Sequence, residues 1–253
     1  MRRDFFDNRK PSLVAMVSGD NTRDVIAEVT NSLYAGADAF GIQLCRLKEE
    51  FRTEEELKKM FGACQGKPIY VTSYRTGQSA GYTYKQCVEL LVRAYGCGAT
   101  LLDIPADFYC PTRNGTTFDE EAVRRQKETV EMLHGLGADV LMSAHHADLL
   151  SEDEIIRHAF AQAERGADVV KLVTMCNTEE DVIFNLSIVG RLKRELGKPF
   201  LYLANGAYGR LIRQLSPTFG ASMYLCVEHY TPDSTKAQTH LASTKLLRDN
   251  LFL

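Results

Sequence analysis

A short motif recurs along most of this sequence and limits what the chain can fold into. Glycine and alanine stand together at Gly36-Ala37, Gly98-Ala99, Gly137-Ala138 and Gly166-Ala167, each followed by Asp or Thr and then by an apolar run. Glycine favours the end of a helix, because it adopts the left-handed backbone that closes the last turn. The motif therefore predicts helices that are each followed directly by a buried strand.

Eight apolar runs have the length of strands, and a stretch with helical periodicity follows each of them. The predicted strands are 13–18, 39–44, 69–74, 101–104, 140–144, 169–175, 200–204 and 222–227. Eight alternations predict an α/β fold, a (β/α)8 TIM barrel. A doubly wound open sheet is the alternative, but the loop at 18–21 is too short for a glycine-rich phosphate loop. We predict a single domain of residues 1–253, with residues 1–11 as an N-terminal cap.

The composition excludes several classes of protein. The chain has 253 residues and a net charge of -3, and its 30 basic residues are scattered, which argues against a nucleic-acid partner. No apolar run approaches the roughly 20 residues of a membrane span, and the first residues lack the apolar core of a signal peptide. Seven cysteines without a CxxC pair argue against disulfides and a zinc site. These features together predict a cytoplasmic protein.

One lysine interrupts the apolar run 169–175. An ammonium inside a buried strand is costly unless its pKa falls or it finds a partner. A neutral amine is a nucleophile towards carbonyl carbon, so Lys171 is a candidate for an imine, or Schiff-base, residue. The alternative is a lysine that reaches solvent past the strand end or pairs with a carboxylate.

Functional side chains of a barrel gather at the carboxyl ends of its strands. The fifth and sixth predicted strands are neighbours, so we expect His145 and Lys171 to face the same mouth. An imine acidifies the adjacent C–H bond, and histidine titrates near neutral pH and can act as its general base. Arg213 offers a planar fork that matches a carboxylate, and Ser234 and Gln238 offer neutral hydrogen bonds.

Each of these residues also has a structural interpretation. His145 and its neighbour His146 could both be imidazoles that bond loop carbonyls. Arg213 could cap a helix or pair with a surface acid, and Gln238 could be an exposed helix residue. Arg75 could position the loop after the third strand. All of these polar residues lie at or after the ends of predicted strands, and this shared location favours a functional site over separate structural roles.

Four segments, in the same order along the chain, resemble the type I 3-dehydroquinate dehydratases. They are 143–145, 166–175, 206–220 and 234–238. They are similar to the family's Ser-x-His at the end of strand five, its lysine strand, its Gly-x-x-Gly segment with a later arginine, and its Ser-Ala-Pro-Gly-Gln lid. The resemblance covers most of the chain and is strongest from Val140 onwards.

The resemblance implies a fold, a reaction and roles. Lys171 would form an imine with the ketone of 3-dehydroquinate, and His145 would remove the α-proton and protonate the departing hydroxyl to give 3-dehydroshikimate. Arg213 would hold the carboxylate, with Ser234 and Gln238 on a closing lid. It also implies a small hydroxylated keto acid as ligand, no metal or organic cofactor, and a homodimer. The pathway is either the shikimate pathway of aromatic amino-acid biosynthesis or the breakdown of quinate.

The first half departs from the family pattern. Gly41, Gln43 and Cys45 stand where the family shows Glu-x-Arg-x-Asp, and Ser79 replaces an acid in the loop after the third strand, although Arg75 fits. Each lost polar contact is worth about 1–3 kcal/mol. Because Gln43, Ser79 and Arg75 stand at positions where the family pattern surrounds the substrate, we predict them as further substrate-binding positions. Three functions stay open: a divergent dehydratase, a Schiff-base lyase or aldolase for another hydroxylated keto acid, and a non-catalytic ligand-binding descendant.

Overall fold

The computed structural model describes residues 5–6, 10–232 and 234–252. The chain forms two compact units, which are described separately. The first unit is Met1–Asp103, Leu225–Tyr230 and His240–Leu253, and the second unit is Ile104–Tyr224 and Thr231–Thr239. This division does not test the predicted single domain of residues 1–253, which stays a prediction. The predicted cap at residues 1–11 falls largely outside the described residues.

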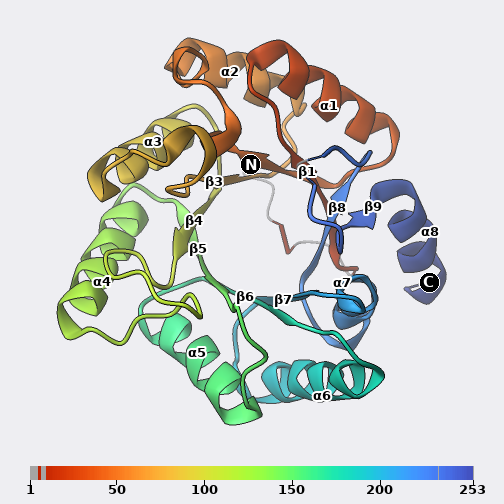
Figure 1. Ribbon diagram of the computed structural model, residues 1–253. Coiled ribbons are helices and arrows are strands. Elements are labelled where there is room, and N and C mark those ends of the chain that lie inside the picture. Colours follow the sequence, from red (N-terminus) through yellow and green to blue (C-terminus); the bar gives the residue numbers. More distant parts are fainter. Residues whose placement is uncertain (1–4, 7–9, 233, 253) are drawn as a thin grey trace. The chain divides into compact units, whose positions relative to one another are not determined.

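Parallel strands form the centre of the first unit. They are β1 (Ser12–Val17), β2 (Ala39–Gln43), β3 (Ile69–Thr72) and the beginning of β4 (Leu101–Pro105), and the end of β8 (Met223–Val227) lies next to β1. The helices are α1 (Thr22–Tyr34), α2 (Glu54–Ala63), α3 (Tyr84–Gly96) and α8 (Leu241–Leu251), with short 3-10 turns η1 (Leu44–Arg46), η2 (Glu49–Phe51) and η3 (Gly77–Ser79). Helices α1 and α2 lie side by side (Figure 1).

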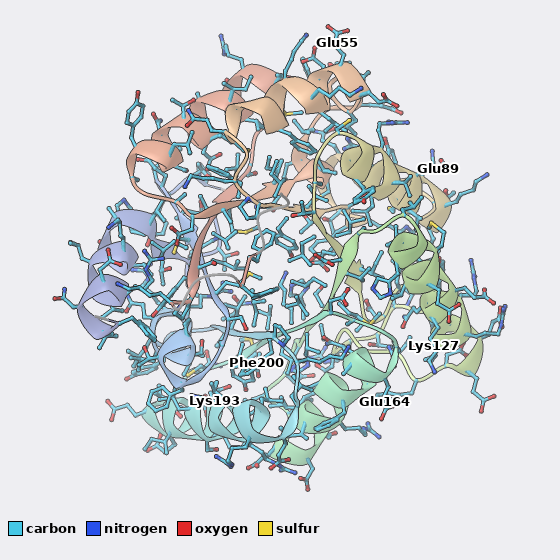
Figure 2. The ribbon with its side chains drawn as sticks, turned by 180° about the vertical axis from the view of Figure 1, so that it is seen from behind. Glu55, Glu89, Lys127, Glu164, Lys193 and Phe200 are labelled. Carbon is cyan, nitrogen blue, oxygen red and sulfur yellow. The ribbon has the colours of Figure 1, made fainter. Side chains whose placement is uncertain are left out.

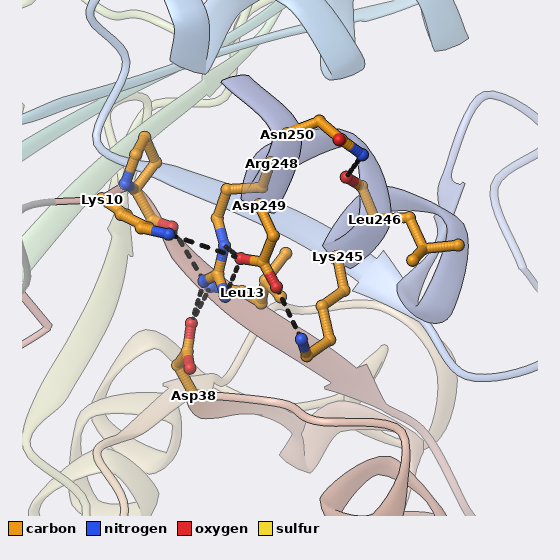
Figure 3. Close-up of polar contacts among 9 residues, drawn as sticks. Lys10, Leu13, Asp38, Lys245, Leu246, Arg248, Asp249 and Asn250 are labelled. Atoms are coloured by element: carbon orange, nitrogen blue, oxygen red, sulfur yellow. Dashed lines mark hydrogen bonds and ion pairs between the residues drawn. The ribbon is translucent and has the colours of Figure 1, made fainter. Parts of the chain in front are cut away.

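An ion-pair cluster attaches α8 to the start of the sheet in the first unit (Figure 3). Asp38, the acid of the first Gly-Ala-Asp motif, accepts a hydrogen bond from the backbone N–H of Leu13 at 3.0 Å and pairs with Arg248. Asp249 pairs with Lys245 at 2.6 Å and with Arg248 at 3.1 Å. The motif thus supplies both a turn and an anchor for the last helix.

Parallel strands flanked by helices also form the described part of the second unit. The strands are β5 (Asp139–His145), β6 (Val169–Met175) and β7 (Phe200–Asn205), next to the end of β4, and the helices are α4 (Glu120–Gly135), α5 (Glu152–Glu164), α6 (Glu179–Glu195) and α7 (Gly209–Phe219). Lys127, Glu164 and Lys193, which are labelled in Figure 2, lie on α4, α5 and α6 and are exposed. Phe200 on β7 is buried.

The glycine motif behaves as the sequence predicts. Gly36, Gly98, Gly137 and Gly166 have φ values of 91°, 117°, 88° and 97°, which is the left-handed region that closes a helix. Asp168 in the second unit makes the same kind of contact as Asp38 in the first. Its carboxylate accepts a hydrogen bond from the backbone N–H of Val140 at 2.8 Å. The motif therefore links the end of one helix to the start of an earlier strand.

The predicted alternation is confirmed. All eight predicted strands are present, with ends that differ by no more than two residues, and a helix follows each one. The α/β class predicted from the sequence is therefore correct. The short strand β9 (Thr239–His240) was not predicted. Within the described ranges, no helix combines the length and the apolarity that crossing a bilayer requires.

Candidate active site

Lys171 and His145 lie on one face of the sheet in the second unit. Ser143 on β5 is the register partner of Lys171 on β6, and His145 is the partner of Val173. Side chains two residues apart on a strand point to the same face, so Ser143, His145 and Lys171 share a face. Lys171 is only 5% exposed, whereas the His145 side chain is exposed. The pair thus combines a buried amine with an accessible imidazole, one strand apart.

A glutamine from α5 holds the backbone of Lys171. The side-chain Oε1 of Gln162 accepts a hydrogen bond from the N–H of Lys171 at 3.1 Å, and its Nε2 donates to the C=O of Lys171 at 3.3 Å. Gln162 is fully buried. It was not among the residues predicted for the site, because a polar residue in a helix sequence usually indicates the solvent face.

The loop between β4 and α4 holds the backbone around His145. Gly115 has a φ of 63°, and a Cβ there would lie 2.5 Å from the backbone nitrogen of His145. Asn114 Oδ1 accepts from the N–H groups of Ala147 and Asp148 at 3.1 and 3.2 Å. The close approach of two backbones requires glycine, and the asparagine fixes the two residues that come after His145 and His146.

Buried side chains from α4 and α5 fix that loop in turn. Arg165, which follows α5, donates to the C=O of Ala106 at 2.8 Å and of Thr117 at 2.5 Å. Gln126 on α4 donates to the C=O of Phe108 at 2.7 Å. These bonds satisfy carbonyl groups of the loop from inside the unit. The position of the loop against β5 is therefore set by the interior of the unit.

The second histidine of the pair, His146, is structural. Its side chain is buried, and its Nε2 lies 3.2 Å from Nδ1 of His158 on α5. Burial lowers the pKa of both imidazoles to about 4, so both rings are neutral at pH 7. His146 therefore has a structural role, as the sequence left open, but the partner of its ring is the imidazole of His158 and not a loop carbonyl.

Arg213 brings a guanidinium to the carboxyl end of β7. It is 6% exposed, and its Nε and Nη2 donate to the C=O of Ala204 at 2.8 Å and to Oδ1 of Asn205 at 3.1 Å. Asn205 is the register partner of Met175, which places it on the same face as Lys171. The sequence showed Asn205 at a strand end, but its alignment with the lysine required the register.

A cavity of about 590 Å³ opens beside Asn205 in the second unit. Its walls come from the loop after β7 and from the segment before β9: Asn205, Gly206, Ala207, Arg210, Thr235, Lys236 and Ala237. The two walls are joined by a hydrogen bond from Nη2 of Arg210 to the C=O of Lys236 at 2.7 Å. The cavity lies at the end of β7, the strand that Arg213 contacts, and its lining residues do not include Lys171, His145 or Arg213.

The predicted lid residues lie in that second wall or next to it. Ser234 Oγ accepts from the N–H of Thr231 at 2.9 Å, which closes a tight turn. Gln238 is buried, and its backbone N–H donates to the C=O of Thr235 at 2.9 Å. Gln238 precedes the helix α8, so it is neither exposed nor helical.

The remaining predicted positions belong to the first unit. Gln43 is the last residue of β2. Ser79 is fully buried in η3. Arg75 is exposed, donates to the C=O of Tyr82 at 2.6 Å and stacks over the ring of Tyr84 at 4.5 Å. The contacts of Arg75 are those of a residue that positions its own loop.

Gly41 has no room for a side chain. A Cβ at this position would collide with Sδ of Met16 and lie 2.9 Å from Cδ1 of Tyr70, its register partners on β1 and β3. Both neighbours are buried. Tyr70 and Tyr74 donate hydrogen bonds to the carboxylate of Asp103, the second at 2.6 Å, and burial raises the pKa of Tyr70 well above its ordinary value.

His, Cys, Asp and Glu side chains, the kinds that bind metal ions, occur throughout the described residues. Over these ranges no group of three or more His, Cys, Asp or Glu side chains has the arrangement of a metal site. The functional groups collected in the second unit are an amine, an imidazole, a guanidinium and amides. Together with the β/α repeats, they define a class of α/β protein in which a buried amine and an imidazole share one sheet face.

Comparison with known proteins identifies the family within this class of α/β proteins. The family model for type I 3-dehydroquinase matches residues 13–238. A 3-dehydroquinate dehydratase of Lactiplantibacillus plantarum is 24% identical over 248 residues, which cover 94% of this chain and 90% of that protein. The chain therefore belongs to the type I 3-dehydroquinase family.

Solved structures show the same fold. The 3-dehydroquinate dehydratase of Geobacillus kaustophilus superposes with a TM-score of 0.83 at 18% identity, over 97% of this chain and 93% of that one. The type I enzyme of Clostridium difficile, solved with covalently modified comenic acid, gives a TM-score of 0.80 at 16% identity, over 98% and 94% of the two chains. The fold class predicted from the sequence is thus confirmed by two independent structures.

Proposed function

We propose that this chain is a carbon–oxygen lyase that dehydrates 3-dehydroquinate to 3-dehydroshikimate through an imine on Lys171. Membership of the type I 3-dehydroquinase family supports the reaction. The observation that carries the mechanism is the placement of a buried Lys171 and of His145 on one face of neighbouring strands. An amine in that position reacts with a ketone, and an imidazole one strand away serves both proton transfers.

The reaction proceeds by covalent catalysis. Nζ of Lys171 adds to the ketone carbon of the substrate, water leaves, and a protonated imine remains. His145 removes the α-proton, and the electron pair moves into the imine to form an enamine. The enamine then expels the β-hydroxyl, which takes the proton from His145 and departs as water. A second water hydrolyses the imine and releases both the unsaturated ketone and the free amine.

The other predicted side chains bind the substrate in this proposal. Arg213 is held at the carboxyl end of β7 by Ala204 and Asn205, where its fork matches a carboxylate. Ser234 and Gln238 belong to the segment before β9, which closes over the ligand and excludes water. The positions in the first unit stay sequence predictions of substrate contacts: Gln43, Ser79 and Arg75.

A second candidate is a Schiff-base lyase or aldolase for a different hydroxylated keto acid. The observation that favours it is the filled space at Gly41, where Met16 and Tyr70 leave no volume for a carboxylate. A ligand hydroxyl next to this position loses a charged acceptor, and a hydroxyl without a partner is disfavoured. The reaction chemistry of Lys171 and His145 is common to both candidates.

Borohydride trapping distinguishes the candidates. The protein is incubated with 3-dehydroquinate and sodium borohydride, and the mass of the intact chain and of its peptides is measured. We expect the reduced adduct on Lys171, none in Lys171→Met, and adduct without dehydration in His145→Ala. Labelling by other keto acids but not by 3-dehydroquinate establishes the second candidate. Labelling by no carbonyl compound identifies a non-catalytic ligand-binding protein, and full turnover in His145→Ala removes that residue from its role.

Partner and location stay predictions from the sequence. We expect a homodimer, which light scattering on the purified chain measures directly. We also expect a cytoplasmic protein of the shikimate pathway, because all seven cysteines are free thiols and five of them are buried. Growth complementation of a strain that lacks dehydroquinate dehydratase tests the biosynthetic role.

A further inference from the structure

A buried amide on α5 contacts the residue that the proposed function makes the nucleophile. Both polar groups of the Gln162 side chain are used on one residue: Oε1 accepts from the N–H of Lys171 at 3.1 Å, and Nε2 donates to its C=O at 3.3 Å. Gln162 is fully buried, as are the apolar Ile155 and Ala159 on the same helix. A polar side chain at such a position requires a specific reason, because its desolvation is offset only by well-made hydrogen bonds.

Two hydrogen bonds to one residue fix more than one bond does. A bond to the N–H and a bond to the C=O together define the rotation of the strand around Lys171. That rotation sets the direction of the Cα–Cβ bond, from which the four-carbon stem of the lysine begins. Because Lys171 is 5% exposed, its stem is enclosed, and its backbone largely decides where the amine lies.

The neighbouring helices provide a comparison. Asn185 on α6 is also fully buried, but it donates to the C=O of Met175 at the end of β6 and accepts from the hydroxyl of Tyr202. Gln126 on α4 bonds loop carbonyls. These two amides bond carbonyl groups at the end of a strand and in a loop, and none of these carbonyl groups belongs to a residue of the proposed reaction. Gln162 differs from them because the residue that it brackets is the proposed nucleophile.

We propose that Gln162 is a positioning residue that aims the amine of Lys171 at the substrate ketone. The inference rests on the proposed function of Lys171 and adds a residue that touches neither substrate nor reacting atoms. Its role is to hold the strand in the orientation that imine formation requires. Loss of such positioning lowers the rate of the chemical steps and leaves substrate binding nearly unchanged.

Gln162→Met tests the proposal, because methionine preserves the volume and removes both hydrogen bonds. We expect kcat and the rate of borohydride trapping on Lys171 to fall by about 10²-fold, with KM changed less than about threefold. Asn185→Leu is the matched control: it removes a buried amide from the next helix and lowers the melting temperature, but trapping proceeds at the wild-type rate. The melting temperature of every variant is measured to show that it is folded at the assay temperature.

Gln162→Glu provides a second measurement, the pH dependence of the trapping rate. A residue that only stabilises the fold would not change this dependence. An ionised glutamate accepts from the N–H of Lys171 but cannot donate to its C=O, whereas a protonated one restores both bonds. Burial raises the pKa of such a carboxyl, so protonation occurs in mildly acidic buffer. We expect the ratio of variant to wild-type trapping rates to rise as the pH falls. The ratio is used because both proteins contain His145, so that any effect of its protonation is the same in each.

The outcomes separate this inference from the proposed function. If the wild-type protein is not trapped by any keto acid, the proposed function fails. If the wild type is trapped and both Gln162 variants react at the wild-type rate at every pH, Gln162 has no positioning role. A fall of equal size in Asn185→Leu assigns the effect to general loss of packing and likewise overturns the inference.

Discussion

At the scale of single residues, the side chains next to Gly41 fill the space that a side chain at this position would need. Its requirement for glycine comes from space rather than from backbone conformation, because Met16 and Tyr70 converge on the position where a Cβ would lie. The departure from the family pattern at Gly41 was visible in the sequence. That two side chains from adjacent strands fill the volume was not, because the contact depends on the register of β1, β2 and β3.

Gly41→Ala is therefore expected to destabilise the protein by about 1–3 kcal/mol through overpacking. The clash is relieved when the neighbour is shortened, so the double variant Met16→Ala/Gly41→Ala should be more stable than the sum of the two single changes by about 1 kcal/mol. Urea unfolding of the four proteins measures this coupling. Strict additivity of the two effects would show that Met16 does not fill the space.

At the scale of elements, the strands were predictable and their supports were not. Buried parallel strands are nearly continuous apolar runs, and a glycine turn precedes four of them, so their positions could be predicted to within two residues. Lys171 stood out as a polar residue inside such a run, and His145 stood out because it comes directly after one. Gln162 and Asn114 could not be recognised, because polar residues in helices and loops are common and their partners are distant in sequence.

The loop before α4 yields a prediction at this scale. Asn114 accepts hydrogen bonds from Ala147 and Asp148, two and three residues after His145. Asn114→Ala frees that segment, and we expect kcat for dehydration to fall about tenfold while trapping on Lys171 persists. Arg113→Ala is the control, because it removes an ion pair to Asp148 between two solvent-accessible side chains, which contributes little to stability. Single-turnover kinetics measure both steps, and equal kcat values for the two variants would contradict the assigned role of Asn114.

At the scale of the whole molecule, the His146–His158 pair makes stability depend on pH. Burial lowers the pKa of both imidazoles from an ordinary value near 6.5 to about 4. The unfolded chain therefore takes up protons before the folded one as the pH falls. The contribution of this pair to the free energy of unfolding is therefore fully present above about pH 6.5 and is lost as the pH falls toward about 4.

His158→Phe isolates this contribution. Phenylalanine keeps a ring against Phe118 and His146 and removes one titrating group. We expect the loss of stability between about pH 7 and pH 4 to shrink by about half, even if the variant is less stable at pH 7. Chemical unfolding at several pH values measures the slope. A slope identical to that of the wild type would assign the acid sensitivity to other groups.

The division of the chain into two units has a consequence for how this protein can change. Lys171, His145, Arg213, Ser234 and Gln238 all belong to the second unit, whereas Gly41, Gln43, Cys45 and Ser79 belong to the first. The residues proposed to make and break bonds thus have a separate set of internal contacts from the positions that depart from the family pattern. Under the proposed function, we expect a directed-evolution library at Gln43 to alter ligand preference and leave the contacts of Lys171 unchanged, whereas Gly41 cannot vary, because Met16 and Tyr70 fill the space of a side chain.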